Sequence, residues 1–326
     1  MNDMITVICP VYNEEKYIGN VLEFFVNAKP DEKELLIIDG GSTDRTVEIV
    51  SEWIENHKNI RLLHNRNKYV PFALNLAIRN SQGDPIIRLD AHTIYEEDYF
   101  LKILETFEKT NADVVGGPMR KIGKTVFQKA ISYATTSVFG IGDSKIHKTD
   151  YNGESDHVYL GAWRRKLFDE IGLFDERLIR NQDDEFHYRA KSFGKKIYLS
   201  SDIKSYYYPR NSFSALFKQY FQYGFYKPLV LQKIRSEIKI RHLIPGIFSL
   251  YFITLPLLLF LSKFFLIPLL IYFFLDLIFT LKSSKGFGES LAIILIYPTI
   301  HLAYGIGFVL GLLKIFRKTS FENSNK

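Results

Sequence analysis

The segment Ile86-Ile87-Arg88-Leu89-Asp90-Ala91-His92-Thr93 determines how the rest of the chain is interpreted. Its bulky apolar residues, interrupted once by Arg88, are typical of a short buried strand in a mostly parallel sheet. Ligands of such sheets bind beyond the carboxyl ends of the strands, so we expect Asp90 and His92 to lie in a binding crevice. Both side chains could face one divalent cation; Mg²⁺ prefers oxygen ligands, whereas Mn²⁺ also accepts an imidazole. The alternative is a strand end at which Asp90 caps a turn and His92 is solvated.

Strands and helices are expected to alternate on both sides of this segment. The patterns predict strands at 5–9, 34–38, 60–64 and 114–118, and helices at 14–28, 44–56, 72–80, 98–109, 166–171 and 183–194. This alternation predicts an α/β fold with a doubly wound parallel sheet. The segment 121–156 is polar and contains glycine, and we expect it to be a mobile loop over the site.

Two other polar segments follow strands at the same edge of the predicted sheet. The first, Pro10-Val11-Tyr12-Asn13-Glu14-Glu15, places Asn13 where it is expected to cap the next helix. In the second, Asp39 ends a strand before a glycine turn, where a carboxylate can accept hydrogen bonds from a nucleobase imide or a ribose hydroxyl. The turn has neither the dinucleotide spacing nor the P-loop spacing, so NAD and ATP chemistry are not favoured. The alternative for Asp39 is a helix-capping turn.

The last third of the chain is apolar and predicts a membrane region. Three stretches, at 244–261, 264–281 and 290–313, are each long enough to form a helix of about 27 Å, close to the hydrocarbon thickness of a bilayer. The helix expected at 212–226 is amphipathic and is predicted to lie in a membrane interface, with a buried core helix as the alternative. The formal net charge of +6 includes basic residues at 227–241, just before the apolar region. This position suits an anionic cytoplasmic membrane face and not a nucleic acid.

Two membrane topologies remain open. Three spans from a cytoplasmic domain would place Lys314, Arg317 and Lys318 outside, against the positive-inside tendency. A hairpin followed by a re-entrant third segment, broken at Pro298 and Gly305, would satisfy that tendency. We therefore divide the chain into an α/β domain at 1–211, an amphipathic helix and basic segment at 212–242, two or three transmembrane helices at 243–313, and a polar tail at 314–326.

Three ordered motifs resemble the family 2 glycosyltransferases with the GT-A fold. They are Pro10-Val11-Tyr12-Asn13-Glu14, Asp39-Gly40-Gly41-Ser42-Thr43-Asp44 and Leu89-Asp90-Ala91-His92. The Asp-Ala-His form, with Arg88 before it and Arg66 after the third strand, is similar to the succinoglycan-biosynthesis type of glucosyltransferase. The resemblance covers roughly the first 230 residues.

The resemblance implies a Rossmann-like GT-A sheet, mixed but mostly parallel, and a UDP-sugar donor. The residues that it assigns to the donor are Pro10, Tyr12, Asn13, Glu14, Asp39, Arg66, Arg88 and Asp90. A divalent cation, Mn²⁺ or Mg²⁺, is implied at Asp90 and His92. The usual family motif is Asp-x-Asp, so His92 is a departure that leaves the identity of the metal open.

The predicted helix at 183–194 opens with three adjacent acids, which the helix dipole would stabilise in any protein. Sugar transfer with inversion needs a carboxylate that takes a proton from the acceptor hydroxyl. The family places this base in a Glu-Asp pair, which here reads Gln182-Asp183, so Asp183 takes the role by position and Asp184 is the alternative. We assign Asp184 to the acceptor side together with Trp163, which would either stack on a pyranose ring or belong to the core.

These features together predict a membrane-associated, metal-dependent inverting glycosyltransferase. It would move a sugar from a cytoplasmic nucleotide sugar to a lipid-linked saccharide at the inner (plasma) membrane, in exopolysaccharide or surface glycan synthesis. The segment 219–223 lacks the Arg-Trp of the motif of processive synthases, which favours the addition of one sugar per acceptor. One alternative uses polyprenyl phosphate as the acceptor, where Asp183 would matter less. The other is a non-catalytic membrane scaffold, against which the carboxylates Asp39, Asp90 and Asp183 argue.

Overall fold

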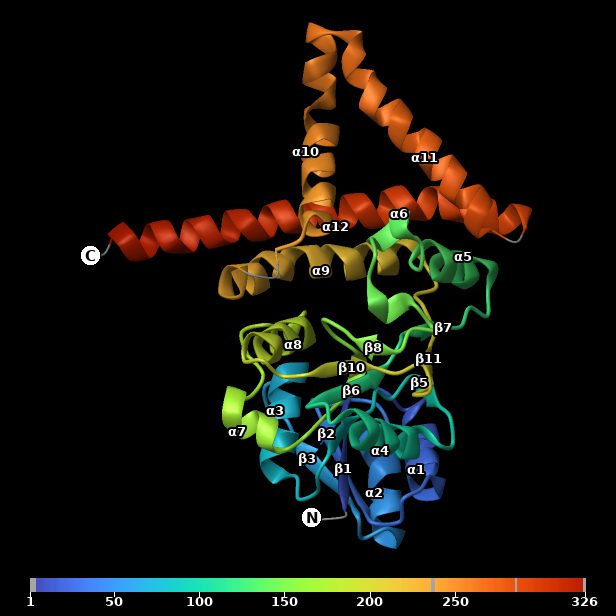
Figure 1. Cartoon of the computed structure of the whole chain (residues 1–326), viewed down its shortest axis with the longest axis vertical. Helices are drawn as coiled ribbons and strands as arrows, with labels where there is room; N and C mark the ends of the chain where they lie inside the picture. The colour runs from blue at the N-terminus through green and yellow to red at the C-terminus, as the bar shows by residue number, and fades with distance from the viewer. Residues whose placement is uncertain (1–3, 236–237, 285, 325–326) are drawn as a thin grey trace. The chain divides into compact units, whose positions relative to one another are not determined.

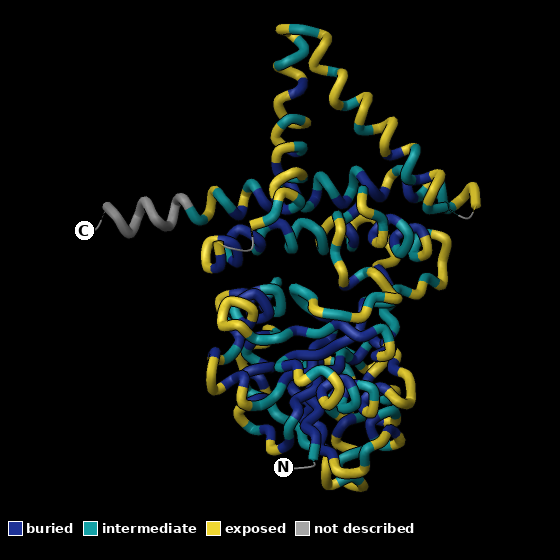
Figure 2. The backbone as a smooth tube through the Cα atoms, viewed as in Figure 1, coloured by how far each residue is buried: buried dark blue, intermediate teal, exposed yellow. Residues whose placement is uncertain are grey.

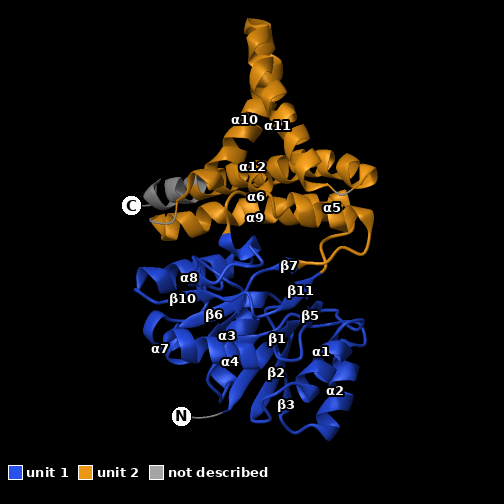
Figure 3. Ribbon diagram, turned by 45° about the vertical axis from the view of Figure 1, so that its right-hand side comes forward, with its two compact units in different colours: residues 1–120, 145–207 blue, residues 121–144, 208–326 orange. Residues whose placement is uncertain are grey.

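The computed structural model describes residues 4–235, 238–284 and 286–324, with side-chain surroundings described as far as residue 315. The chain divides into two compact units (Figure 3). Unit 1 contains residues 1–120 and 145–207, and unit 2 contains residues 121–144 and 208–326.

Unit 1 is organised around a mixed sheet. In the described part of the chain its strand order is β3-β2-β1-β4-β9-β6-β10-β8. The strands are β1 (Ile5–Val11), β2 (Lys33–Asp39), β3 (Ile60–His64), β4 (Ile86–Arg88), β6 (Val114–Gly117), β8 (Gly153–Glu154), β9 (Tyr159–Trp163) and β10 (Ile197–Leu199). Neighbouring strands are parallel except where β9 pairs with β4 and β6 and where β8 pairs with β10. A second sheet contains β5 (Thr93–Tyr95), β11 (Ser205–Tyr207) and β7 (Arg120–Lys121), in that order.

Helices cover both faces of the main sheet, as the alternation of strands and helices predicts. They are α1 (Ile18–Asn27), α2 (Thr46–Asn56), α3 (Val70–Asn80), α4 (Tyr99–Thr110), α7 (Lys166–Ile171) and α8 (Gln182–Ser192). Alternate residues of a strand point to opposite faces, so Val7 and Cys9 pack with α1, α2 and α4, whereas Ile8 packs with α3, α7 and α8. The sheet is therefore buried on both sides, and its binding edge lies at the carboxyl ends of the parallel strands.

The segment 121–156 is not a loop throughout, so that expectation was wrong. It contains α5 (Val126–Ala134), α6 (Val138–Ile141), a 3-10 turn η1 (Lys145–His147) and β8. Thr125 caps α5 with a reciprocal pair of hydrogen bonds to Gln128. Residues 121–144 belong to unit 2, where Ala130 and Ile131 of α5 pack with Ile293 and Ile296.

Unit 2 contains the apolar C-terminal helices (Figure 1). They are α9 (Phe213–Lys233), α10 (Ile240–Leu261), the 3-10 turn η3 (Lys263–Leu266), α11 (Ile267–Ser283) and α12 (Phe287–Ser324). Among the residues that the structure describes, three segments are long and apolar enough to cross a membrane: Ile240–Leu261, Lys263–Ser283 and Phe287–Ile315. Helix α12 is continuous through Pro298 and Gly305, so the break at these residues, which belonged to one of the two topologies left open, is absent.

Helix α9 is longer than predicted and buries one side against α12. Glycines allow the two backbones to approach: a Cβ atom added at Gly224 would lie 2.0 Å from the carbonyl oxygen of Tyr304, and one at Gly307 would lie 2.2 Å from that of Phe221. Part of α9 is therefore a packed helix, which was the alternative to a purely interfacial one. In the described part of unit 2, most exposed large hydrophobic residues lie along α10 and α11, and Figure 2 shows the exposure of both helices.

This close contact predicts that Gly224→Ala destabilises the protein. Alanine improves intrinsic helix propensity, but here its methyl group would displace a backbone carbonyl, and overpacking of this kind costs about 1–3 kcal/mol. Gly19→Ala in α1 is the matched control, because a Cβ atom at Gly19 meets nothing within 4 Å. Thermal unfolding of the purified full chain in detergent should show a lower midpoint for Gly224→Ala and no decrease for Gly19→Ala. Equal midpoints for both variants would contradict the packing described for α9 and α12.

Candidate active site

The loops that follow β1 and β2 are joined by hydrogen bonds. The side-chain oxygen of Asn13 accepts a bond from the Thr43 backbone at 2.8 Å, and the Asn13 backbone donates to the Ser42 hydroxyl at 2.9 Å. The helix that follows begins at Ile18, and Tyr17 occupies its N-cap without a side-chain bond. The prediction that Asn13 caps this helix was therefore wrong; Asn13 instead fixes one binding-edge loop against the other.

Asp39 shapes the turn that follows it. Its buried carboxylate accepts hydrogen bonds from the backbone nitrogens of Gly41 and Ser42, both at 3.0 Å. Gly41 has a φ of +83°, a conformation that glycine adopts without strain. Asp39 thus forms the turn but does not cap α2, whose N-cap is Arg45, and its contact with a nucleobase stays a prediction.

The loop after β3 adds a cation that the sequence did not single out. Lys68 donates a hydrogen bond to the Tyr12 hydroxyl at 2.7 Å, and its ammonium lies 4.0 Å from the centre of the Tyr12 ring. A Cβ atom at Gly40 would lie 2.9 Å from the Lys68 carbonyl oxygen, so this turn packs against the glycine. Arg66 is exposed in the same loop. The signal for Lys68 was its place in the loop after a predicted strand, two residues from Arg66.

Asp90 and His92 lie where the predicted strand ends. The Asp90 backbone nitrogen donates to the Tyr95 hydroxyl at 2.7 Å, which fixes the turn beyond β4. The His92 Nδ1 atom lies 3.3 Å from a carboxylate oxygen of Glu14. Within the residues that the structure describes, no three acidic, histidine or cysteine side chains gather as a metal-binding group. Asp90 and His92 thus supply at most part of a coordination shell.

Arg88 joins two of the predicted site carboxylates. Its Nε donates to Asp90 at 3.0 Å, and its Nη1 lies 3.0 and 2.9 Å from the two oxygens of Asp183. The Arg88 side chain is only 10% exposed, whereas that of Asp183 is 38% exposed. Asp183 therefore remains within reach of a ligand while Arg88 holds it from behind. A direct contact between Arg88 and the donor stays a prediction.

The charges of this trio are linked. Burial lowers the pKa of Arg88, but Asp183 and Asp90 raise it by more, so the guanidinium stays charged. Burial raises the pKa of Asp183, the cation of Arg88 opposes this, and the negative charges of Asp90 and Asp184 add to it. A carboxylate with a raised pKa is a stronger base than an ordinary surface aspartate.

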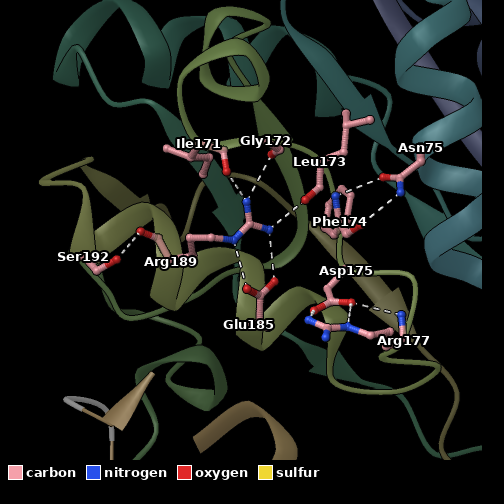
Figure 4. A network of polar contacts seen from close by, with 10 residues as sticks. All are labelled: Asn75, Ile171, Gly172, Leu173, Phe174, Asp175, Arg177, Glu185, Arg189 and Ser192. Carbon is pink, nitrogen blue, oxygen red and sulfur yellow. Dashed lines mark hydrogen bonds and ion pairs between the residues drawn. The ribbon is translucent and has the colours of Figure 1, made fainter. Parts of the chain in front are cut away.

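A buried network fixes the helix that carries Asp183 (Figure 4). Glu185 is fully buried and binds Arg189 through two hydrogen bonds, at 2.9 and 3.0 Å. Arg189 also donates to the carbonyl oxygens of Ile171, Gly172 and Leu173 in the loop after α7. The start of α8 is therefore held to the body of unit 1 by charge-assisted bonds.

Trp163 belongs to the core. Its ring is fully buried in β9, with ring centres of Phe174 at 5.6 Å and His187 at 6.5 Å. A ring without exposed surface cannot stack on a sugar, so the acceptor role assigned to Trp163 was wrong. His187 lies one helical turn after Asp183, and burial lowers its pKa to about 3, so its imidazole is neutral. Asp184 is half-buried on the same first turn of α8, and its acceptor role stays a prediction.

The mixed sheet with acidic residues beyond β2 and β4 defines a GT-A fold. A mannosyltransferase of Pyrobaculum calidifontis, solved with GDP-Man and Mn²⁺, has a TM-score of 0.61 and 16% identity, over 95% of this chain and 86% of that one. TarS of S. aureus (residues 1–349), solved with UDP-GlcNAc, has a TM-score of 0.54 and 16% identity, over 97% of this chain and 92% of that one. At such identities these structures support the fold alone.

Sequence comparison then gives the family. The sequence profile of glycosyl transferase family 2 matches residues 6–172. The succinoglycan biosynthesis protein ExoA of Rhizobium meliloti (strain 1021) is 32% identical over 73% of this chain and 73% of its own length. A dolichyl N-acetyl-alpha-D-glucosaminyl phosphate 3-beta-D-2,3-diacetamido-2,3-dideoxy-beta-D-glucuronosyltransferase of Methanococcus voltae is 32% identical over 71% of this chain and 75% of its own length. The chain belongs to glycosyl transferase family 2, as its three motifs predicted.

The network around Arg189 generates a stability prediction. Arg189→Met would leave the carboxylate of Glu185 buried without its cation, which typically costs about 3–5 kcal/mol. Arg177→Met is the control, because Arg177 also pairs with an acid, Asp175, at 2.7 Å but is 81% exposed. An exposed pair contributes about 0–1 kcal/mol. Chemical denaturation of the full chain should separate the two variants clearly, and similar losses would show that the Glu185–Arg189 pair does not anchor α8.

Proposed function

We propose that this protein transfers one sugar from a UDP-sugar to a lipid-linked saccharide, with inversion at the anomeric carbon. The observation that carries the proposal is the placement of Asp183 beside the binding edge of the sheet, held there by Arg88 together with Asp90. Family membership supports the transfer reaction, and the three joined loops after β1, β2 and β3 support nucleotide binding at this edge.

The donor would lie over the loops that contain Tyr12, Asp39 and Lys68. Tyr12 offers an aromatic face, and Lys68 offers a positive charge near the diphosphate. The structure of the S. aureus neighbour with UDP-GlcNAc supports a uridine nucleotide, whereas the P. calidifontis neighbour binds GDP-Man. The choice of UDP therefore depends on the resemblance of this chain to the succinoglycan type.

Asp90 and His92 fit a divalent cation by their donor chemistry. A carboxylate oxygen and an imidazole nitrogen suit Mn²⁺, and the remaining positions of its shell would be filled by diphosphate oxygens and water. A cation bound there would supply positive charge that stabilises the diphosphate as it leaves. The neighbour solved with Mn²⁺ supports this assignment.

Asp183 would act as the general base. The acceptor hydroxyl attacks the anomeric carbon, its proton passes to Asp183, and the bond from that carbon to the diphosphate breaks with its electrons leaving on the nucleoside diphosphate. Arg88 would orient the carboxylate for this transfer through its contacts with both oxygens. Because the leaving diphosphate needs no proton, one carboxylate suffices for the proton transfer.

The acceptor and the location follow from the relatives and from unit 2. One relative is named for succinoglycan biosynthesis and another for transfer to a dolichyl-linked sugar phosphate, which supports a lipid-linked saccharide acceptor. The apolar helices of unit 2 support association with a membrane. We place the protein at the plasma membrane with its catalytic unit in the cytoplasm. Nucleotide sugars are present there, and the basic segment 227–241 would face the anionic cytoplasmic side of the membrane.

The base assignment predicts a contrast between neighbouring acids. Asp183→Asn keeps the shape of the side chain but removes the proton acceptor, so transfer should fall by about 10²–10⁴-fold while donor binding survives. Asp184→Asn is the matched control for loss of negative charge at the helix start and should cost much less. Transfer to a labelled lipid-linked saccharide and donor affinity by calorimetry would be measured for both. If Asp184→Asn is the inactive variant, the assignment is displaced by one residue. If both transfer normally to a sugar hydroxyl, the base is not in this pair.

The metal assignment predicts that a chelator abolishes transfer and that Mn²⁺ restores it. His92→Ala should weaken Mn²⁺-supported donor binding, because one of the two proposed protein ligands is lost. His57→Ala is the control, since His57 follows α2 and precedes β3, at the edge of the sheet opposite to Asp90 and His92. Full activity in the presence of the chelator would contradict a metal-dependent mechanism.

A further inference from the structure

Helix α12 runs alongside α9 for most of the length of α9. Near the start of α9, Leu216 packs with Ile293, Ile296 and Ile300, and further along Gly224 meets Tyr304. Beyond that point, a Cβ atom added at Gly311 would lie 2.3 Å from the carbonyl oxygen of Phe225 and 3.2 Å from the side chain of Pro228. The two helices therefore run in the same direction. Because they pack side by side, they must share one orientation and one depth relative to a membrane.

Helix α9 is too polar to cross a bilayer. It contains Lys218, Lys227 and Lys233, and it is not among the candidate spans found in the described residues. It follows residues 145–207 of unit 1 in the chain, and the candidate spans found in the described residues all come after it. A partner that lies along most of its length must then stay at the membrane surface as well, since a spanning α12 would draw these lysines through the hydrocarbon.

The hairpin of α10 and α11 meets α12 on the side opposite α9. A Cβ atom at Gly305 would lie 2.0 Å from the carbonyl oxygen of Pro245 in α10, whereas those at Gly307 and Gly311 would meet α9. With about 100° per residue, Gly305 points away from Gly307 and Gly311. Figures 1 and 3 agree that α10 rises from one side of α12 while α9 lies along the other.

An exposed apolar stripe lies on α12 between the side that meets the hairpin and the side that meets α9. Leu291, Leu295, Leu310 and Leu313 are each between 43% and 59% exposed, and by the helical step they share one face. In the apolar 18-residue part of α12, 44% of the residues are buried inside the protein, compared with 17% in α10 and 11% in the segment that contains α11. α10 and α11 thus resemble helices surrounded by lipid, whereas α12 has one face on protein and one apolar face beside the hairpin.

The charges agree with this arrangement. The ammonium of Lys314, near the C-terminal end of α12, lies 5.3 Å from the ring of Phe225 in α9. The basic residues before α10 and Lys282 at the end of α11 also lie at the base of the hairpin, and Lys263 lies at its tip. If α12 does not cross the bilayer, the positive residues at 314–318 remain on the side of the basic segment 227–241, as the positive-inside tendency requires.

We propose that only α10 and α11 span the membrane and that α12 lies in its surface, with the leucine stripe in the acyl boundary and its opposite face on α9. The third apolar segment, long enough to span, is thus an in-plane support that holds α9 against the bilayer. The partner of this surface is the lipid bilayer itself, because the stripe continues directly into the lipid-exposed hairpin. The inference depends on the membrane association proposed above but not on the transfer reaction.

Labelling by a membrane-impermeant maleimide tests the topology in the full chain. The native chain is the unlabelled control, because its single cysteine, Cys9, is buried. Three variants are compared in membrane vesicles of known sidedness: Ser51→Cys in the catalytic unit, Lys263→Cys at the hairpin tip and Ser320→Cys after the apolar part of α12. We expect positions 51 and 320 to be labelled from one side and position 263 from the other. Labelling of 320 and 263 from the same side would overturn the proposal.

Depth measurement with spin labels tests the orientation of α12 independently of sidedness. Positions 295 and 310 share one face and are separated by about 22 Å along the helix axis. For labels at these positions we expect equal, shallow depths from the accessibility to oxygen and to a water-soluble nickel chelate. Labels at Leu250 and Leu257 in α10 are the control and should differ in depth. A depth difference between 295 and 310 close to their axial separation would show that α12 spans. If the protein shows no donor turnover but both labelling experiments give the expected results, the proposed reaction is contradicted and the proposed topology is not.

Discussion

The site depends on one buried cation shared by two carboxylates. Arg88 is the last residue of the central strand β4, and its guanidinium contacts Asp90 in the next turn and Asp183, which lies 95 residues later in the chain at the start of α8. A buried guanidinium without a partner would cost several kcal/mol, so this arrangement is stable only when at least one carboxylate is in place. The cation thereby sets the distance between the edge of the sheet that would bind the donor and the helix that would supply the base.

The same helix is fixed from its other side. Glu185 and Arg189 tie α8 to the loop after α7, and Asn75 of α3 exchanges hydrogen bonds with the backbone of Phe174 in that loop. Asp183 is therefore held by a rigid helix and by Arg88 at once, and its carboxylate retains an exposed side. Such preorganisation matters for a base, because a small displacement of the accepting oxygen weakens proton transfer strongly.

Local patterns in the sequence were sufficient for the elements and for the binding edge. Alternation of apolar residues placed most strands and helices of unit 1, and Asp39 and Asp90 were found because each follows a buried strand. The contact of Arg88 with Asp183 joins distant residues, and a single sequence contains no signal for it. The core position of Trp163 and the bonds of Asn13 to the second loop were missed for the same reason, since both depend on which elements pack together.

Hydropathy had a similar limit in unit 2. It identified three apolar helices, but length and composition are alike for a spanning helix and for one that lies between a protein surface and lipid. The glycines of α9 and α12 carried the missing information, because their spacing permits the close packing that keeps both helices at one depth. Residues 121–144 were assigned to a loop because the apolar partners of α5 in α9 and α12, among them Phe213 and Ile293, lie far away in the sequence.

The central claim is that Arg88 acts through Asp183, and the pH dependence of kcat/KM tests it most directly. The base must be deprotonated, so the acid limb of the profile reports its pKa in the free enzyme. The positive charge of Arg88 lowers the pKa of Asp183. Its loss in Arg88→Gln should therefore move the acid limb to higher pH and reduce the plateau, while Arg88→Lys, which keeps the charge, should leave the limb closer to that of the native protein. An acid limb that stays in place in Arg88→Gln, with only donor affinity reduced, would contradict the account.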